Sequence, residues 1–152
     1  MTFVSAELIE KTWRRVGSYN GIEIQRTQKR HQKLQKALTK FVYSRLHEFR
    51  EDAGGVFIYV FHVIVEAFEN APALLKSISK RQIDFVSEDT DFNAAFSIAR
   101  ATECTPESHA LQYAYEALTE ADDVALSQHE IDSFLVNLEV VIECLHRACQ
   151  RR

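Results

Sequence analysis

Val56 to Val65, the stretch Val-Phe-Ile-Tyr-Val-Phe-His-Val-Ile-Val, is the part of this 152-residue chain that decides its fold class. The β-branched and aromatic residues in it would also suit a buried strand. A helix is the better interpretation, because the apolar pattern continues from Ile64 to Phe68 at helical spacing and a lone central strand would have no partner. A helix that is apolar on nearly all sides belongs in the middle of a bundle. We therefore predict a central helix over residues 56–69.

Composition and helix-start signals favour helices in the rest of the chain as well. Only four glycines and two prolines occur, too few for the turns of a β-meander. Thr105-Pro106-Glu107 places a proline at a first helical position, and Ser127 with Glu130 forms a capping box. The sequence predicts a single all-α domain over residues 1–152, a bundle of about seven helices. The expected segments are 5–16, 22–51, 56–69, 70–81, 91–103, one that begins near 105, and 128–149.

Charge is sorted along the chain. Residues 1–50 carry eleven Lys/Arg against four Asp/Glu, a balance of +7, whereas residues 51–152 carry seven against eighteen, a balance of −11. The whole chain sums to −4. Within residues 84–143, fourteen acids face one base, Arg100. This polarity predicts a basic surface and an acidic surface on one small protein, and with them a partner or self-association.

The basic residues fall on one side of the predicted helix 22–51. At 100° per residue, the apolar residues from Ile24 to Phe49 occupy one sector and the cations occupy the opposite one, so the cations point away from the core. A solvated face is the ordinary alternative for such a row. The partner we expect is an acidic protein surface, or region 84–143 of a second copy. The candidate partner-binding residues are Arg26, Lys29, Arg30, Lys33, Lys36 and Lys40.

A nucleic-acid binder that tracks phosphates with the same basic face, 26–40, is the main alternative function. Three observations weigh against it: the chain is acidic, with a pI of 5.9, no aromatic residue lies among these bases to stack on single strands, and no helix-turn-helix or zinc-finger pattern surrounds them. A membrane role is disfavoured because the apolar sector of this helix is needed for the core. The run 56–65 has ten residues, which is too short to span a bilayer.

Metal-ligand spacing occurs at two places. Glu143 and His146 have the Glu-x-x-His spacing of carboxylate-bridged di-iron bundles, but the second such motif that those sites need is absent. His62 and Glu66 are four residues apart on the central helix, where a buried histidine tied to a carboxylate is usually structural. His31 falls on the apolar sector of the basic helix and is interpreted as a packing residue. We predict no metal and no cofactor, and the weak metal-ligand candidates are Glu143, His146, His62 and Glu66.

No motif identifies a reaction. The three cysteines lack paired spacing, and Gly54-Gly55 lacks the Lys-Ser/Thr of a phosphate loop. The N-terminus has no basic region followed by an apolar run, so a cytoplasmic location is expected. The functional hypothesis is a non-enzymatic intracellular interaction or regulatory protein that uses the basic face and the acidic surface to bind another protein or a second copy of itself. An enzyme with a His/Glu or metal site is the third alternative.

Overall fold

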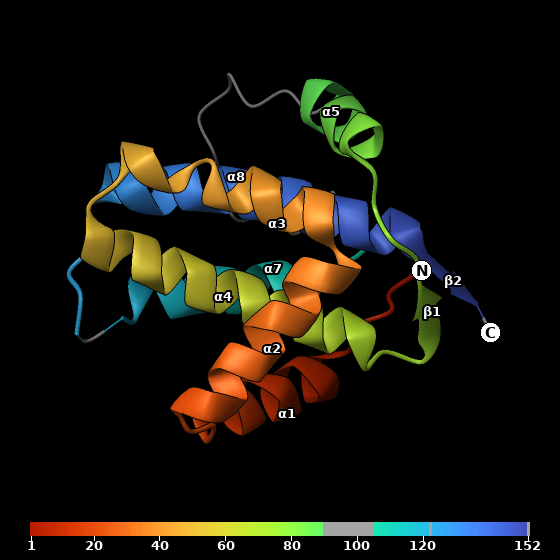
Figure 1. Cartoon of the computed structure of the whole chain (residues 1–152), viewed down its shortest axis with the longest axis horizontal. Helices are drawn as coiled ribbons and strands as arrows, with labels where there is room; N and C mark the ends of the chain where they lie inside the picture. The colour runs from red at the N-terminus through yellow and green to blue at the C-terminus, as the bar shows by residue number, and fades with distance from the viewer. Residues whose placement is uncertain (90–104, 122, 152) are drawn as a thin grey trace.

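Seven α-helices and a short two-stranded ribbon make up most of the part of the chain that the structure describes. The computed structural model describes residues 1–89, 105–121 and 123–151. These helices form a bundle (Figure 1), which confirms the all-α prediction. In chain order the elements are α1 (Ala6–Gly17), α2 (Gly21–Leu34), α3 (Lys36–Tyr43), the 3-10 turn η1 (Leu46–Glu48), α4 (Glu51–Glu69), β1 (Ala73–Leu75), α5 (Lys80–Asp89), α7 (Ser108–Thr119), α8 (Gln128–Ala148) and β2 (Cys149–Arg151).

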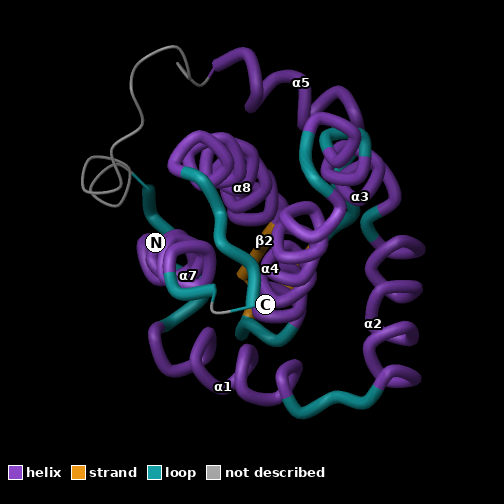
Figure 2. The backbone as a smooth tube through the Cα atoms, turned by 90° about the vertical axis from the view of Figure 1, so that its left-hand side faces the viewer, coloured by secondary structure: helices purple, strands orange, loops and turns teal. Residues whose placement is uncertain are grey.

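Helix α4 lies in the middle of the bundle, as predicted for residues 56–69. It contacts α1, α2, α3, α7, α8 and β1, and Figure 2 shows these elements arranged around it. Every residue from Val60 to Phe68 is buried. Phe57 stacks on Phe134 of α8 with ring centroids 4.6 Å apart. Since α4 is apolar on nearly all sides, its burial supplies much of the hydrophobic core.

The glycines before Val56 lie inside α4 and do not stop a helix, so the expected break at 53–55 is wrong. Helix α4 begins at Glu51, with Arg50 as its N-cap. A Cβ built on Gly54 would lie 3.2 Å from a methyl carbon of Leu46. The glycine is therefore at a close approach between η1 and α4, where its missing side chain matters more than its backbone freedom.

The predicted helix 22–51 is also wrong, because the chain breaks at Gln35 and again after Tyr43. Gln35 has φ −128° and ψ 58°, outside the helical region. Its buried side chain donates to the carbonyl of Lys76 at 2.9 Å and accepts from the N–H of Ile78 at 3.0 Å. Apolar periodicity continues across the break, which is why the sequence read as one helix. As a result, α2 and α3 run in different directions (Figure 1).

Residues 70–79 form a strand and a loop where most of a helix over 70–81 was expected. Strand β1 pairs antiparallel with β2, the segment that follows α8, with Ala73 opposite Arg151. Strand β1 depends on its pairing with β2, and no sequence pattern near residues 73–75 predicts it. Helix α5 begins at Lys80, where Ser79 and Gln82 form a capping pair.

The remaining predicted segments agree to different degrees. Ser5 caps α1, and Ser127 with Glu130 forms the expected capping box of α8. Helix α5 continues to Asp89, beyond the predicted helix end at residue 81. The predicted helix 91–103 lies outside the described residues. Among the helices that the structure describes, none is long and apolar enough to cross a membrane.

Replacing Gln35 with Leu should lower the free energy of unfolding by about 1–3 kcal/mol, because it leaves the buried N–H of Ile78 and the carbonyl of Lys76 without partners. Urea denaturation measures this. Gln25→Leu, at an exposed position on α2, is the matched control and should change stability by no more than about 0.5 kcal/mol. Equal effects of the two substitutions would show that Gln35 does not hold the loop to α3.

Candidate functional site

A buried chain of polar side chains joins α2, α3 and α4. The hydroxyl of Tyr43 lies 3.0 Å from His62 Nε2, His62 Nδ1 lies 2.7 Å from His31 Nδ1, and His31 Nε2 lies 3.0 Å from Glu66 Oε1. His31 is fully buried, and His62 and Glu66 are each 4% exposed. We call these four residues the buried polar chain. His62 and Glu66 were expected as a direct pair, but His31 lies between them.

One arrangement of protons satisfies the buried polar chain when both rings are neutral. An ionised Glu66 only accepts, so His31 must carry its proton on Nε2. His31 Nδ1 is then an acceptor for His62 Nδ1–H, and His62 Nε2 accepts from the Tyr43 hydroxyl. Each buried donor therefore has an acceptor, and the tautomers of both histidines are fixed by Glu66.

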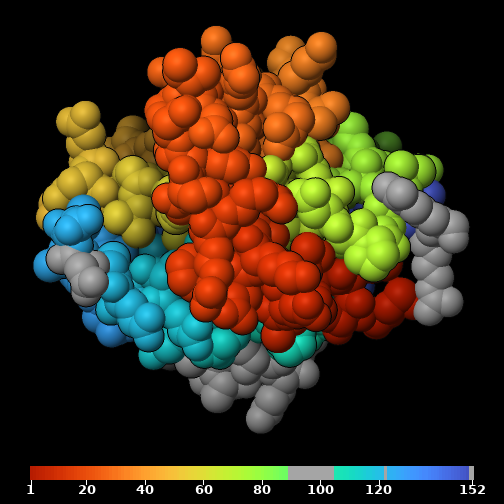
Figure 3. Space-filling model, turned by 90° about the horizontal axis from the view of Figure 1, so that it is seen from below, coloured from red at the N-terminus to blue at the C-terminus, as the bar shows by residue number. Residues whose placement is uncertain are grey.

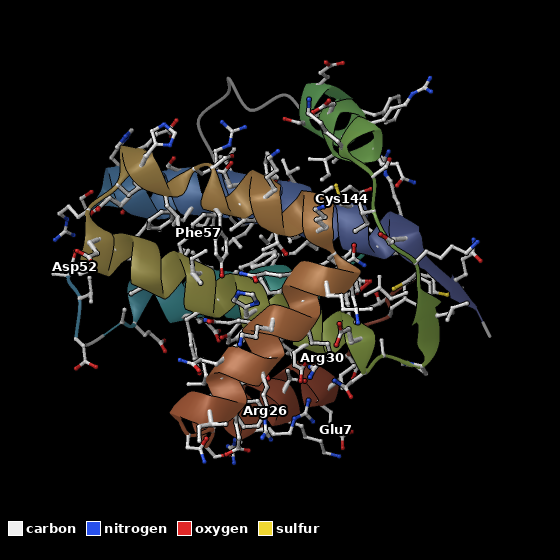
Figure 4. All side chains as sticks on the ribbon, in the orientation of Figure 1. Glu7, Arg26, Arg30, Asp52, Phe57 and Cys144 are labelled. Carbon is white, nitrogen blue, oxygen red and sulfur yellow. The ribbon has the colours of Figure 1, made fainter. Side chains whose placement is uncertain are left out.

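Two arginines neutralise the buried end of this chain. Arg30 of α2 donates to Glu66, and its Nε lies 3.3 Å from Glu69 Oε2. Arg15 of α1 lies 3.7 Å from the other oxygen of Glu66. Figure 4 shows Arg30 where α2 passes the C-terminal part of α4. Glu66 thus ties α1 and α2 to the central helix.

Burial and hydrogen bonds together set the charge states of His62 and Glu66. Burial lowers the pKa of His62 to about 3, with a further contribution from neighbouring His31. Burial by itself would raise the pKa of Glu66, but hydrogen bonds from His31 and Arg30 outweigh it and lower that pKa to about 2. Burial raises the pKa of Glu69. Near neutral pH, His62 is therefore uncharged and Glu66 is ionised.

His31, Glu66 and Glu69 are the described residues whose donor atoms come closest to metal-site geometry. One atom of each lies within 4.8 Å of the others. Arg30 donates to both carboxylates, so the two acids of the group are already bound to a protein cation. A metal ion would have to displace it. The arrangement therefore suits an ion-paired structural group better than a metal centre.

Glu143 and His146 do not face a common point. Glu143 accepts from Arg147 at 2.9 Å, whereas His146 Nδ1 lies 2.9 Å from the buried carboxylate of Glu107. Glu107 also accepts from the backbone N–H groups of Phe3 and Val4. His146 is therefore paired with Glu107 and not with Glu143. It helps to hold the N-terminal segment against α7 and α8.

Five of the six predicted partner-binding cations are exposed and make no ion pair with any acid in the described ranges. Arg30 differs, because its guanidinium is bound to Glu66 and Glu69. The helix break at Gln35 divides the five between two helices. Figure 3 shows α2, in orange, across one face of the molecule beside α1. We call the five residues the α2–α3 basic surface: Arg26, Lys29 and Lys33 on α2, and Lys36 and Lys40 on α3.

A groove adjoins this surface where α3 faces the loop before α5 and the first turns of α5. It has a volume of about 640 Å³. Lys36 and Lys40 line one side, and Arg45 and Lys80 extend the positive rim. Asp84 is the one acid in the lining. Arg45 and Lys80 were not among the predicted partner-binding residues, because the contact of α5 with α3 that brings them to one groove is a tertiary contact that no local pattern encodes.

Two of the described acids in region 84–143 are used inside the fold. Glu107 is fully buried, and Glu130 accepts two hydrogen bonds from Arg50. The hydrogen bond from Arg50, with the backbone of Ser127, lowers the pKa of Glu130 to about 2. Glu88, Glu116, Glu120 and Asp123 are exposed. Residues 90–104 of this region lie outside the described part of the chain.

Comparisons with protein-family models, with curated proteins and with solved structures find no match to this chain. We therefore infer function from the contacts, burial and charge of this chain's own residues. Four surface cavities lined by described residues lie away from the buried polar chain, and none of these four borders His31, His62 or Glu66.

Stability should fall as the pH is lowered from 6.5 toward 3, because the unfolded chain protonates His62 near its ordinary pKa of 6.5 and the folded chain does so only near 3. Glu66 adds to this loss only below its ordinary value of 4.5. His62→Gln should therefore flatten the dependence between pH 6.5 and 4.5, measured by urea denaturation. His109→Gln, at an exposed site on α7, should leave the dependence unchanged. An unaltered slope in His62→Gln would contradict the assignment.

Proposed function

We propose that this protein is a non-enzymatic interaction protein whose α2–α3 basic surface binds an acidic surface of another protein in the cytoplasm. The observation that carries the proposal is that Arg26, Lys29, Lys33, Lys36 and Lys40 are exposed and unpaired among the described residues, although the chain is acidic overall. Glu66 and Glu69 of α4, the helix on which α2 packs, are bound to Arg30. The positive potential therefore stays available to a partner.

The buried polar chain supports this proposal indirectly. Arg30 is held by Glu66 and Glu69, and His31 is buried, so one side of α2 is fixed to α4. The opposite side then carries its lysines outward in a fixed position. A preorganised set of charges binds with a smaller entropic cost than a mobile one.

A second copy of the chain is the other partner of the same chemistry. Exposed Glu116, Glu120 and Asp123 would be the contact for the basic surface of that copy. Nucleic acid remains the alternative with the same cations, and steep weakening of duplex binding with salt would favour it.

Reversing three of these charges, in Lys29→Glu with Lys33→Glu and Lys36→Glu, should leave the thermal midpoint close to that of the unchanged protein, since all three side chains are exposed. Association should weaken at least about tenfold at low salt, because like charges then face each other. Partner capture from the native host and sedimentation equilibrium give the two measurements, for a foreign partner and for self-association.

The matched control reverses the same number of charges elsewhere, in Lys11→Glu with Arg14→Glu and Lys76→Glu. Lys11 and Arg14 make exposed ion pairs on α1, and such pairs contribute little to stability. The control should keep its partner and its oligomeric state. If both triple variants associate as the unchanged protein does, the basic surface has only a solubility role.

A further inference from the structure

We infer that the groove between α3 and α5 is the anchor site of the interaction surface, and that it takes an acidic protein segment carrying a bulky apolar side chain among its carboxylates. This inference rests on the proposed function and names the chemistry of the partner. Three observations lead to it: the charge of the rim, the apolar floor and an arginine without an acceptor.

The rim of the groove is strongly positive. Lys36, Lys40, Arg45 and Lys80 line it against one acid, Asp84, so its formal balance is four positive charges to one negative. None of the four cations makes an ion pair with a described residue. A ligand with several carboxylates therefore meets uncompensated positive charge here.

The floor of the groove is apolar. Ile78 and Ile83 are each 2% exposed at its base, and the ring of Phe41 is partly buried beside them. A ligand that makes only ionic contacts with the rim would leave this apolar floor exposed to water. An apolar side chain from the partner would displace that water, at about 25 cal/mol for each Å² of apolar surface that it buries.

Arg45 connects the rim to the floor. Its guanidinium carbon lies 4.9 Å from the centre of the Phe41 ring, and its buried Nε has no hydrogen-bond partner among the described groups. The guanidinium is thus stacked in place without an internal carboxylate, and its outer nitrogens suit a carboxylate on a ligand. Because Arg45 covers the Phe41 ring, that ring is not free to stack on a base, which argues against single-stranded nucleic acid.

The groove differs from the cavities beside Arg50 and between α5 and α8 in combining a positive lining with a large volume. The cavity beside Arg50 also contains Glu48 and Glu130, so its charges offset one another. The cavity between α5 and α8 has about half the volume, near 340 Å³. The α3–α5 groove alone among these combines a large volume with a net positive rim, which is the complement of an acidic segment.

The test uses two labelled synthetic peptides. One consists of glutamates and aspartates around a central leucine and phenylalanine, and the other replaces these two with serine at the same net charge. Fluorescence anisotropy should give at least about tenfold tighter binding of the first peptide, as expected for burial of one or two apolar side chains. Amide shifts in an NMR titration should concentrate in residues 36–45 and 77–84.

Two variants of the chain separate the outcomes. Lys40→Glu with Lys80→Glu should abolish binding of both peptides, and Ser44→Trp, which fills the groove from an exposed position without changing charge, should remove only the preference for the apolar one. Lys11→Glu with Arg14→Glu should bind both peptides as the unchanged protein does.

Equal binding of the two peptides would overturn the anchor site. The proposed function would still stand if the triple variant Lys29→Glu with Lys33→Glu and Lys36→Glu weakens association. Shifts confined to α2, or preferential binding to anionic lipid vesicles or to single-stranded DNA, would overturn the anchor site as well. Failure of both the peptides and the native-partner assay would overturn the proposed function itself.

Discussion

The contact between His31 and His62 is the interaction on which the arrangement of the basic surface depends. Two imidazole nitrogens meet at 2.7 Å in a buried environment, where an unpaired polar atom is costly. Their proton arrangement is set at one end by ionised Glu66 and at the other by Tyr43. Because each residue comes from a helix next to α4 or from α4 itself, the chain fixes the orientation of α2 and α3 together.

Because the orientation of α2 and α3 is fixed, the cations around these helices have two different roles. Arg15 and Arg30 turn inward toward Glu66 and stabilise the contact of α1 and α2 with α4. The lysines on the opposite side of α2 and along α3 stay exposed. The excess of positive charge over residues 1–50 is therefore partly structural and partly available for binding.

The sequence was sufficient to predict the class of fold and its central helix, because Val56–Phe68 is apolar at every turn and helices elsewhere have capping residues. It was not sufficient for the break at Gln35, since that break is held by hydrogen bonds to Lys76 and Ile78, about forty residues away in the chain. Strand β1 depends in the same way on residues beyond α8. Long-range pairings of single polar groups leave no periodic pattern.

The candidate site, too, could be predicted only in part from the sequence. Exposure of all six cations follows from helical periodicity, which the break at Gln35 does not disturb on either side. The pairing of Arg30 with Glu66 and Glu69, by contrast, requires the packing of α2 on α4, which no local pattern encodes. His31 looked like a packing residue because it lies on the apolar sector. That position places the His31 ring against the ring of His62.

The most direct test of this account is ¹⁵N NMR of the histidine side chains near neutral pH. The account predicts that His62 is neutral and protonated on Nδ1, that His31 is protonated on Nε2, and that a coupling across the hydrogen bond joins the two Nδ1 atoms. Loss of that coupling in Glu66→Gln would show that the carboxylate sets the tautomers. A His62 ring that titrates near the ordinary histidine pKa, with no coupling to the ring of His31, would contradict it.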